Sequence, residues 1–181
     1  MKLLLLLLAA SVLAGCASTT TERLGLPPPR TVEHVDLTRY LGTWYEIASI
    51  PQRFQSDCTA SQAEYALRED GLLSVINSCR KGSLNGRLDV AKGRARVVDK
   101  ETNAKLEVSF FGPFWGDYWI LELGERYDYS VVGHPSRDYL WILCRERAMA
   151  PELYNAILGR LEAQGYETER LVKTLQPAPD A

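Results

Sequence analysis

The sequence predicts an all-β domain, a barrel or a sandwich of eight strands followed by one helix. Eight short runs rich in apolar residues follow one another between residues 42 and 145, with Gly, Pro, Asn or Asp between them. One amphipathic pattern comes after these runs. Because 46% of the 181 residues are hydrophobic, the chain can bury a core, and its length suits one domain.

The strands are expected where turn signals bound an apolar run. Alternation is clearest where Leu106, Val108 and Phe110 share one face. Asp70-Gly71 predicts a tight hairpin turn. The expected strands span residues 42–50, 58–67, 72–80, 87–98, 104–111, 117–123, 127–132 and 138–145.

The segment after the strands predicts a helix that begins near Pro151. Leu153, Ile157 and Leu161 lie on one stripe, and Gly165 suits the C-terminal end. A helix with one apolar stripe is expected on the outside of the sheet. Residues 171–175 predict a short extra strand.

The N-terminus predicts export rather than fold. Lys2 precedes an apolar run that is too short to span a bilayer but suits a signal peptide of residues 1–15. The run ends in Leu13-Ala14-Gly15-Cys16, which resembles the lipobox of bacterial lipoproteins. The resemblance implies cleavage before Cys16 and lipidation of that residue, and Ala17 after it implies outer-membrane sorting. The alternative is an ordinary secretory signal with an incidental cysteine.

Residues 16–33 predict a tether, because they combine a polar stretch with Pro27-Pro28-Pro29. The seventeen residues 17–33 reach about 55 Å when extended, enough to hold a domain away from a bilayer. Residues 177–181 are expected to form a tail.

Three cysteines remain in the expected domain. Folding back about Asp70 places Cys58 near Cys79, so these two are expected to form a disulfide in an exported chain. Their spacing matches no zinc pattern. Cys144 is left as a buried, inert thiol.

Three short motifs identify a family resemblance. Gly42-Thr43-Trp44 opens the first strand, Tyr127-Asp128 lies between two later strands, and Arg145 ends the last one. In this order they resemble the signature of the lipocalins, in particular the bacterial outer-membrane lipocalins. The likeness runs from about residue 35 to 176, within an expected barrel of residues 34–176. It implies an eight-stranded up-and-down antiparallel barrel with the helix packed outside.

Such a topology sends alternate loops to opposite ends and would bring the three motifs together. We expect the Arg145 guanidinium over the Trp44 ring, in a cation–π contact worth roughly 0.5–2 kcal/mol. This end is expected to be a closed structural plug rather than a catalytic site. The closed-end residues are Gly42, Trp44, Tyr127, Asp128 and Arg145.

The opposite, open end is expected to carry exposed aromatic side chains, which suit a lipid or bilayer surface. The alternative is a minor core in which these residues fold over one another. The residues are Phe54, Leu84, Phe111, Phe114, Trp115 and Pro135.

Alternation along the strands predicts which side chains line the barrel interior and bind ligand. Glu46 and Asn77 would orient a polar headgroup or satisfy each other. The predicted ligand-binding residues are Ala48, Tyr65, Val75, Val97, Leu106, Val108, Phe110, Tyr118, Ile120, Tyr129, Val131, Tyr139 and Trp141. By the same parity, Leu140, Ile142 and Cys144 face outward, under the helix.

The sequence lacks the common catalytic patterns. It has two histidines, in expected loops, and neither a Gly-x-Ser-x-Gly elbow nor a phosphate-binding Gly loop. We therefore expect no catalytic residue, no metal and no cofactor. The net charge of −2 argues against nucleic acid as a partner.

The resemblance implies a lipoprotein anchored in the outer membrane of a Gram-negative bacterium and facing the periplasm. Its barrel would bind a fatty acid or a lysophospholipid in envelope lipid storage, transport or repair. A homodimer is one option for its assembly. The alternatives are an enzyme that acts on a lipid-like substrate through Cys144, and a structural protein with a solid core.

Overall fold

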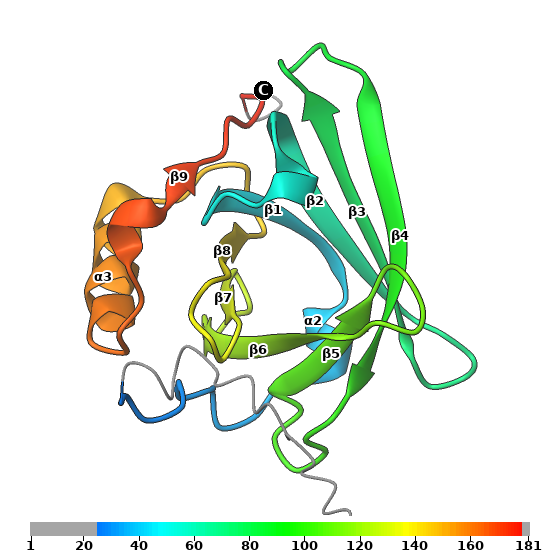
Figure 1. Cartoon of the computed structure of the whole chain (residues 1–181), viewed down its shortest axis with the longest axis vertical. Coiled ribbons are helices and arrows are strands. Elements are labelled where there is room, and N and C mark those ends of the chain that lie inside the picture. The colour runs from blue at the N-terminus through cyan, green and yellow to red at the C-terminus, as the bar shows by residue number, and fades with distance from the viewer. Residues whose placement is uncertain (1–24, 179–181) are drawn as a thin grey trace, which may run out of the picture.

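A computed structural model describes residues 25–178, which form a closed antiparallel barrel with one long helix outside it (Figure 1). The strands hydrogen-bond in the order β2-β3-β4-β5-β6-β7-β8-β1, and the pairing of β1 with β2 closes the ring. The strands are β1 (Gly42–Ser49), β2 (Cys58–Leu67), β3 (Leu73–Lys81), β4 (Leu88–Val97), β5 (Lys105–Ser109), β6 (Gly116–Leu123), β7 (Tyr129–Gly133), β8 (Leu140–Cys144) and β9 (Val172–Lys173).

The predicted eight-stranded barrel and outer helix are confirmed, with strand ends that move by at most a few residues. The long helix is α3 (Pro151–Glu162), and two short 3-10 turns are η1 (Arg53–Gln55) and η2 (Thr168–Arg170). A single-turn helix, α2 (Leu37–Tyr40), was not predicted. The Asp36 side chain caps it by accepting the backbone N–H of Thr38 and of Arg39.

The apolar side chains form two separate layers, one inside the barrel and one between the barrel and α3. The inner cluster includes Tyr40, Trp44, Ala63, Tyr65, Leu73, Val75, Ala95, Ala104, Leu106, Ile120, Val132 and Leu143. The outer cluster includes Ile47, Ala48, Ile50, Leu121, Val131, Leu140, Ile142, Cys144, Tyr154, Ile157, Leu161 and Tyr166.

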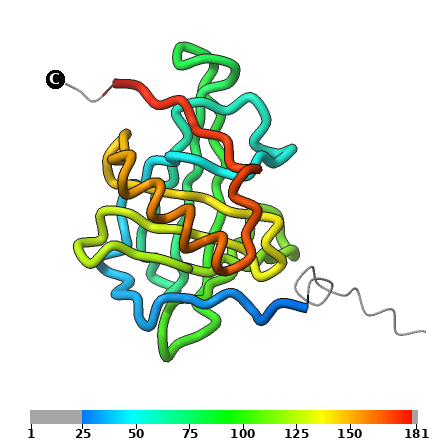
Figure 2. Tube along the Cα trace, turned by 90° about the vertical axis from the view of Figure 1, so that its left-hand side faces the viewer, coloured from blue at the N-terminus to red at the C-terminus, as the bar shows by residue number. Residues whose placement is uncertain are grey.

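Helix α3 lies across the outside of the barrel (Figures 1 and 2). Ile157 and Leu161 are fully buried beneath it, which matches their common stripe. Burial of one such side chain contributes about 1.5–3 kcal/mol, so the helix is held by its stripe rather than by its own propensity. No helix in the part of the chain that the structure describes is long and apolar enough to cross a membrane.

A β-bulge changes which side chains of β1 face inward. Glu46 pairs with Leu143 of β8, whereas Ala48 pairs with Ile142, so Ile47 is an extra residue in the ladder. Ile47 and Ala48 both join the outer cluster. The prediction that Ala48 lines the interior is therefore wrong.

The side chains of strand β7 also face the opposite way from the prediction. Tyr129 and Val131 lie against the outer cluster, while Ser130 and Val132 point inward. Apolar residues occupy both faces of this strand, so alternation alone did not fix its parity. The prediction that Tyr129 and Val131 line the interior is wrong.

Residues 25–36 lie against the barrel wall, although the sequence predicted a tether as far as residue 33. The backbone N–H of Val32 donates to Ile120 O at 3.0 Å, where β6 has left β5. The N–H of Val35 donates to Thr102 O at 2.7 Å. In Figure 2 this blue segment crosses below the barrel before it enters β1.

The C-terminal segment completes the wall where β2 leaves β1. Strand β9 pairs with Ala48 and Ser49 of β1. Beyond it, Ala60 N–H donates to Leu175 O at 2.7 Å, and the Gln176 amide donates to Glu46 O and to Ser61 O, each at 2.8 Å. One segment thus joins both neighbouring strands.

Candidate functional site

The closed end of the barrel is built around Arg145, which follows β8. Its guanidinium carbon lies 3.7 Å from the centroid of the Trp44 ring. The same group donates to Thr43 O at 2.7 Å and to Leu41 O at 2.8 Å. It therefore ties the first strand to the last one, and burial lowers the pKa of Arg145 from its usual value.

The other closed-end residues surround this contact. Gly42 has a φ of +89°, and a Cβ there would lie 3.5 Å from Nη1 of Arg145. The Asp128 carbonyl accepts the Arg145 backbone N–H at 2.8 Å, and the Tyr127 carbonyl accepts from Nε at 3.3 Å. The Tyr127 hydroxyl in turn accepts the Asp36 N–H at 2.8 Å, which fixes the start of α2. These contacts make a structural stopper.

Tyrosine hydroxyls form a chain at the inner side of this stopper. The Tyr118 hydroxyl lies 2.9 Å from those of Tyr40 and Tyr65, and Tyr40 also bonds Ser130 Oγ at 3.0 Å. Burial raises the pKa of Tyr40, Tyr65 and Tyr118, so the phenols remain neutral. The barrel floor therefore offers neutral hydroxyl groups rather than a charge.

Most residues predicted to contact ligand lie on the inner face, and three do not. Ala48, Tyr129 and Val131 belong to the outer cluster. Tyr139 precedes β8, and its ring stacks on that of Trp141 with centroids 6.2 Å apart. The inner cluster contains Tyr65, Val75, Leu106 and Ile120 as buried members and Val97, Val108, Phe110, Tyr118 and Trp141 as partly buried ones.

The inner face is not fully covered by protein atoms. Val108, Phe110, Tyr118 and Trp141 are only partly buried, although they point into the barrel. Asn77 lies on the same face of β3 as Val75, and it is exposed. Solvent therefore reaches the interior beside β3, and a ligand could take the place of that solvent.

The hydrogen-bond partners of the Glu46 carboxylate are residues other than Asn77. The Glu46 carboxylate accepts from Ser49 Oγ at 3.1 Å, from Gln55 Nε2 at 2.5 Å and from Thr174 Oγ1 at 2.5 Å. Glu46 therefore joins β1 to the loop after it and to the C-terminal segment.

Large aromatic side chains are exposed in the loops of the open end. Phe54, in the loop between β1 and β2, is 71% exposed. Phe111 and Phe114, in the loop between β5 and β6, are 79% and 77% exposed. Trp115 instead packs beside Arg94 and Arg96, and Leu84 and Pro135 are partly buried. The three phenylalanines do not form a minor core.

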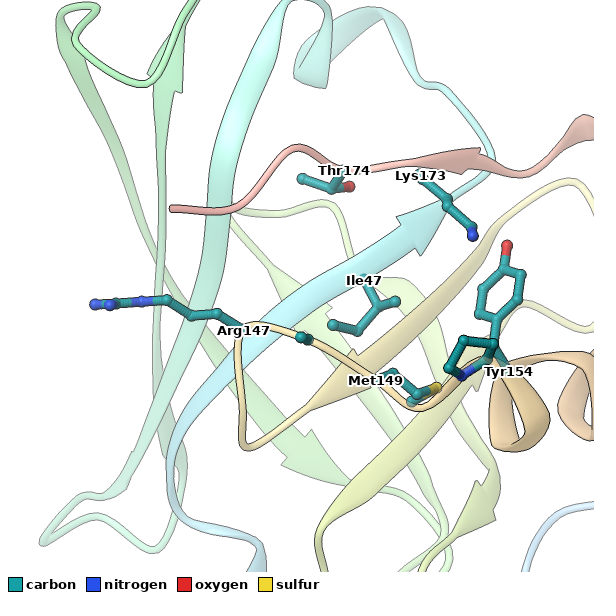
Figure 3. Close-up of a pocket in the computed structure, with 8 residues that line it drawn as sticks. Ile47, Arg147, Met149, Tyr154, Lys173 and Thr174 are labelled. Carbon is teal, nitrogen blue, oxygen red and sulfur yellow. The ribbon is translucent and has the colours of Figure 1, made fainter. Parts of the chain in front are cut away.

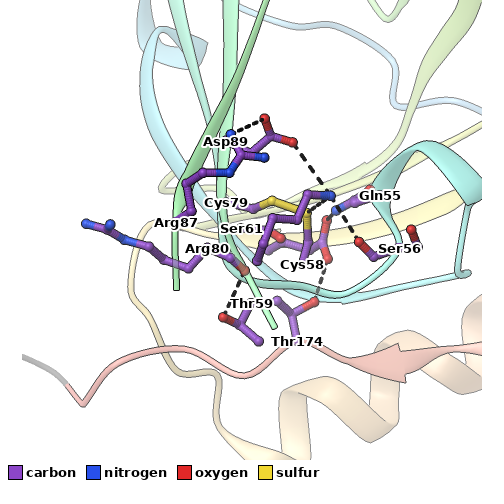
Figure 4. The surroundings of a disulfide bond; sticks show 12 residues. Gln55, Ser56, Cys58, Thr59, Ser61, Cys79, Arg80, Arg87, Asp89 and Thr174 are labelled. Carbon is purple, nitrogen blue, oxygen red and sulfur yellow. Dashed lines mark hydrogen bonds and ion pairs between the residues drawn. A yellow bond between two sulfur atoms is a disulfide. The ribbon is translucent and has the colours of Figure 1, made fainter. Parts of the chain in front are cut away.

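The predicted disulfide is confirmed at the open end of β2 and β3. Cys58 and Cys79 are bonded across the strand pair, with their Cα atoms 5.5 Å apart (Figure 4). Lys81 Nζ lies beside the bond, donates to Ser56 O at 3.0 Å and pairs with Asp89 at 3.6 Å. The bridge and the lysine together fix the first loop of the open end.

Cys144 is a free, buried thiol on the outer side of β8. Burial raises its pKa above the usual value for a thiol, which disfavours the reactive thiolate. It lines a surface pocket of about 320 Å³ together with Met149 and Leu153. Among residues 25–178, no group of three His, Cys, Asp or Glu side chains is placed to hold a metal ion.

A second surface pocket, of about 210 Å³, lies outside the barrel between β1, β9 and the start of α3 (Figure 3). Tyr154 and Lys173 form one side of it, with the ammonium 4.8 Å from the ring centroid. Figure 3 shows Arg147 extending away from the other labelled side chains. Ile47 forms the floor between β1 and α3.

Sequence reasoning missed two residues that contact the barrel interior. Tyr40 precedes the signature motif, yet its carbonyl accepts the Trp44 indole N–H at 2.9 Å and its hydroxyl anchors the hydroxyl chain. Gln55 was also missed, because loop position carries no alternation pattern.

Comparisons with known proteins agree with this architecture. The model of the lipocalin-like domain family matches residues 35–176. The outer membrane lipoprotein Blc of Escherichia coli K12 is 37% identical over 172 residues, covering 93% of each chain. Temperature-induced lipocalin-1 of Arabidopsis thaliana is 38% identical over 154 residues, covering 80% of this chain and 81% of its own.

A solved structure extends the comparison at the level of the fold. Insecticyanin of the tobacco hornworm Manduca sexta superposes with a TM-score of 0.68 at 20% identity and covers 84% of this chain and 87% of its own. The family match covers the whole barrel, from the segment before α2 to the residues after β9. This chain is therefore a member of the lipocalin-like domain family.

Proposed function

We propose that this protein is an outer-membrane lipoprotein whose barrel binds an elongated hydrophobic ligand, a fatty acid or a lysophospholipid. The observation that carries the proposal is the inner face, which is apolar and in part not covered by protein atoms. The similarity to the outer membrane lipoprotein Blc supports the location and the lipid anchor.

The inner face suits an alkyl chain in both area and chemistry. Burying a few hundred Å² of chain contributes several kcal/mol at about 25 cal/mol per Å², before the cost of ordering. We therefore expect a dissociation constant in the micromolar range or tighter. The neutral hydroxyls of Tyr40, Tyr65 and Tyr118 at the floor offer hydrogen bonds without a charge.

Tryptophan fluorescence of delipidated protein tests ligand binding. Trp141 lies on the inner face, so titration with lysophospholipid below its micelle concentration is expected to give a saturable change in emission. The variant Trp141→Phe is expected to lose most of this change while the protein keeps its fold. A linear, non-saturable response in the delipidated protein argues instead for the structural protein with a solid core.

The anchor is a separate part of the proposal. Cys16 lies outside the described residues, and its lipidation is inferred from the lipobox resemblance. Mass spectrometry of the N-terminal peptide is expected to find acyl chains on Cys16, and Cys16→Ser is expected to release the protein from the membrane fraction. A wild-type protein found in the soluble fraction contradicts the anchor but leaves ligand binding intact.

The proposal includes no catalytic step. The candidate nucleophile, Cys144, faces α3 rather than the barrel interior, and burial raises its pKa. Native alkylation with iodoacetamide is expected to be slow. Rapid labelling that lipid protects against would favour the enzyme.

The homodimer is tested apart from the ligand. Light scattering after size exclusion in detergent distinguishes a protein mass near that of one chain, 20.3 kDa before processing, from twice that mass, which a homodimer requires.

A further inference from the structure

The described chain begins beside the open end of the barrel. Arg137, in the loop between β7 and β8, is 4% exposed, and its Nη2 donates to Pro27 O at 2.6 Å. Its Nε donates to Gln164 O at 2.7 Å, and the Gln164 side chain accepts the Arg30 N–H at 2.8 Å. We call Pro27, Arg30, Arg137 and Gln164 the N-terminal clasp.

The surrounding residues make the clasp a packed contact. Gly165, just after α3, has a φ of +82°, and a Cβ there would lie 2.5 Å from Cδ1 of Leu26. Pro29 is buried. In Figure 2 the blue start of the described chain lies on the same side as the yellow loop before β8 and the cyan loop after β1. The clasp therefore holds the N-terminal segment near the open end.

Because the clasp holds Pro27 against the barrel, only the residues between Cys16 and Pro27 can span the distance from a lipid anchor to the barrel. Only eleven residue steps separate Cys16 from Pro27, and they span at most about 40 Å when fully extended. The nine residues of β3 alone rise about 30 Å along the wall. If the closed end faced the membrane, the residues between Cys16 and Pro27 would have to run along the length of the barrel, which would take up most of their extended length. If the open end faces the membrane, they do not have to run along the barrel.

The surface around the open end has the composition of a membrane contact. Phe111 and Phe114 project from one loop and Phe54 from another. Leu88 and Val90, on the outer face of β4, are 50% and 46% exposed. Apolar side chains at loop tips gain free energy when they enter the interface of a bilayer.

Cations accompany these apolar side chains. The chain as a whole carries a charge of −2. Even so, the exposed residues beside the open-end loops include Arg53, Arg80, Arg87, Lys92 and Arg94, against one exposed acid in the loop before β2, Asp57. Asp89, which pairs with Lys81 and Arg87, lies on the inner face of β4. Aromatic tips flanked by cations are complementary to anionic lipid headgroups.

We propose that the open end docks on the anionic bilayer that carries the lipid anchor, so that a lipid passes between membrane and barrel without crossing water. The proposal rests on the anchoring proposed above. The N-terminal clasp sets the orientation, and the phenylalanine tips with their flanking cations form the contact.

Position-specific fluorescence tests the orientation of the anchored protein. Phe114→Cys at the open end and Leu67→Cys at the closed end are labelled with the same dye in a Cys144→Ala background. Leu67 is a matched control because its side chain is also largely exposed, at 65%. The lipidated full chain is placed in vesicles of phosphatidylethanolamine and phosphatidylglycerol that contain spin-labelled lipid.

The expected result is several-fold stronger quenching at position 114 than at position 67. Equal quenching at the two positions, or stronger quenching at 67, overturns the proposal. Mass spectrometry of Cys16 and the lysophospholipid titration, made on the same sample, report on anchoring and ligand binding separately. A failure of the orientation is therefore distinguishable from a failure of the proposed function.

Vesicle binding by the full chain with Cys16→Ser tests the surface without the anchor. Phosphatidylglycerol vesicles are expected to bind this chain more tightly than phosphatidylcholine vesicles. Phe111→Ser combined with Phe114→Ser is expected to weaken binding about tenfold or more, because two exposed aromatic side chains are lost. Leu67→Ser is expected to leave binding unchanged. Equal loss in both variants, or no preference for the anionic vesicles, overturns the docking surface.

Discussion

The Gln55 side-chain carbonyl accepts the indole N–H of Trp141 at 3.3 Å, so a loop of the open end is held to a residue of the inner face. The same side chain donates to the Glu46 carboxylate at 2.5 Å. The loop that carries Phe54 is therefore tied to two strands of the wall.

Gln55→Ala is expected to speed both the entry and the release of ligand. The change removes two hydrogen bonds that hold the loop, each worth about 1 kcal/mol, so both rate constants should rise by up to about thirtyfold with little change in the dissociation constant. Stopped-flow fluorescence measures the two rates. Gln62→Ala, on the outer face of β2, serves as the control and should leave both rates unchanged.

Arg145→Met is expected to lower the free energy of unfolding by about 2–4 kcal/mol. The change removes the contact with Trp44 and leaves the carbonyls of Thr43 and Leu41 without their donor. Urea denaturation measures the effect. Arg126→Met is the control, because Arg126 is highly exposed and should cost less than about 0.5 kcal/mol. Equal effects of the two changes would contradict the stopper.

Val108→Glu is expected to weaken binding of a fatty acid at least about tenfold. Val108 is partly buried on the inner face, where a carboxylate would repel the ligand and remove apolar contact. Isothermal titration measures the affinity. Val98→Glu, at an exposed position after β4, should bind as the wild type does. If Val108→Glu binds the fatty acid with unchanged affinity, the inner face is not part of the binding site.

Replacing Cys58 and Cys79 by serine is expected to lower the free energy of unfolding by about 3 kcal/mol. The bridge spans 21 residues, and its loss restores the conformational entropy of that loop to the unfolded chain. In urea denaturation, the wild type with dithiothreitol should have the same free energy of unfolding as the double variant without it. If the reductant leaves the free energy of unfolding of the wild type unchanged, the bridge contributes little to stability.

Acid is expected to destabilise the loop between β7 and β8 through His134. Burial is the main cause of the lowered pKa of His134, and its Nδ1 accepts the Ser136 N–H at 3.0 Å. Because the folded state favours the neutral ring, this contribution is present above the usual histidine pKa of about 6.5. It is lost as the pH falls below that value through the lowered pKa.

Thermal unfolding between pH 7.5 and 5 measures this effect. His134→Asn keeps an acceptor near Ser136 without a titrating ring, so its melting temperature should fall less over the same range. Parallel curves for the two proteins would exclude His134 as the cause.

Strand positions, the helix and the disulfide could be predicted because each depends on a local pattern. The facing of Ala48 could not be predicted, because the bulge at Ile47 lies in the pairing of β1 with β8, a strand far along the chain. Val131 and Val132 are both apolar, so the sequence does not tell which one points inward. The structure places Val132 in the inner cluster and Val131 in the outer one, and Ser130 bonds Tyr40 inside the barrel.

The short strand expected at residues 171–175 is present as β9, but the other contacts of the two chain ends escaped prediction because they join residues far apart in the sequence. The contact between Arg137 and Pro27 joins residues 110 positions apart, and neither residue belongs to a periodic pattern. The role of Gln176 depends on two strands that separate just where its side chain reaches them. Such contacts follow from the finished architecture and leave no trace in neighbouring residues.

The place of residues 172–176 between β1 and β2 has a consequence for how the protein matures. Synthesis proceeds from the N-terminus, and the seam between the first two strands is sealed by residues that follow α3. The cylinder thus stays unsealed until all eight strands and the helix have been made. A chain that is kept unfolded up to that point therefore has an incomplete wall, even though its first two strands are already present.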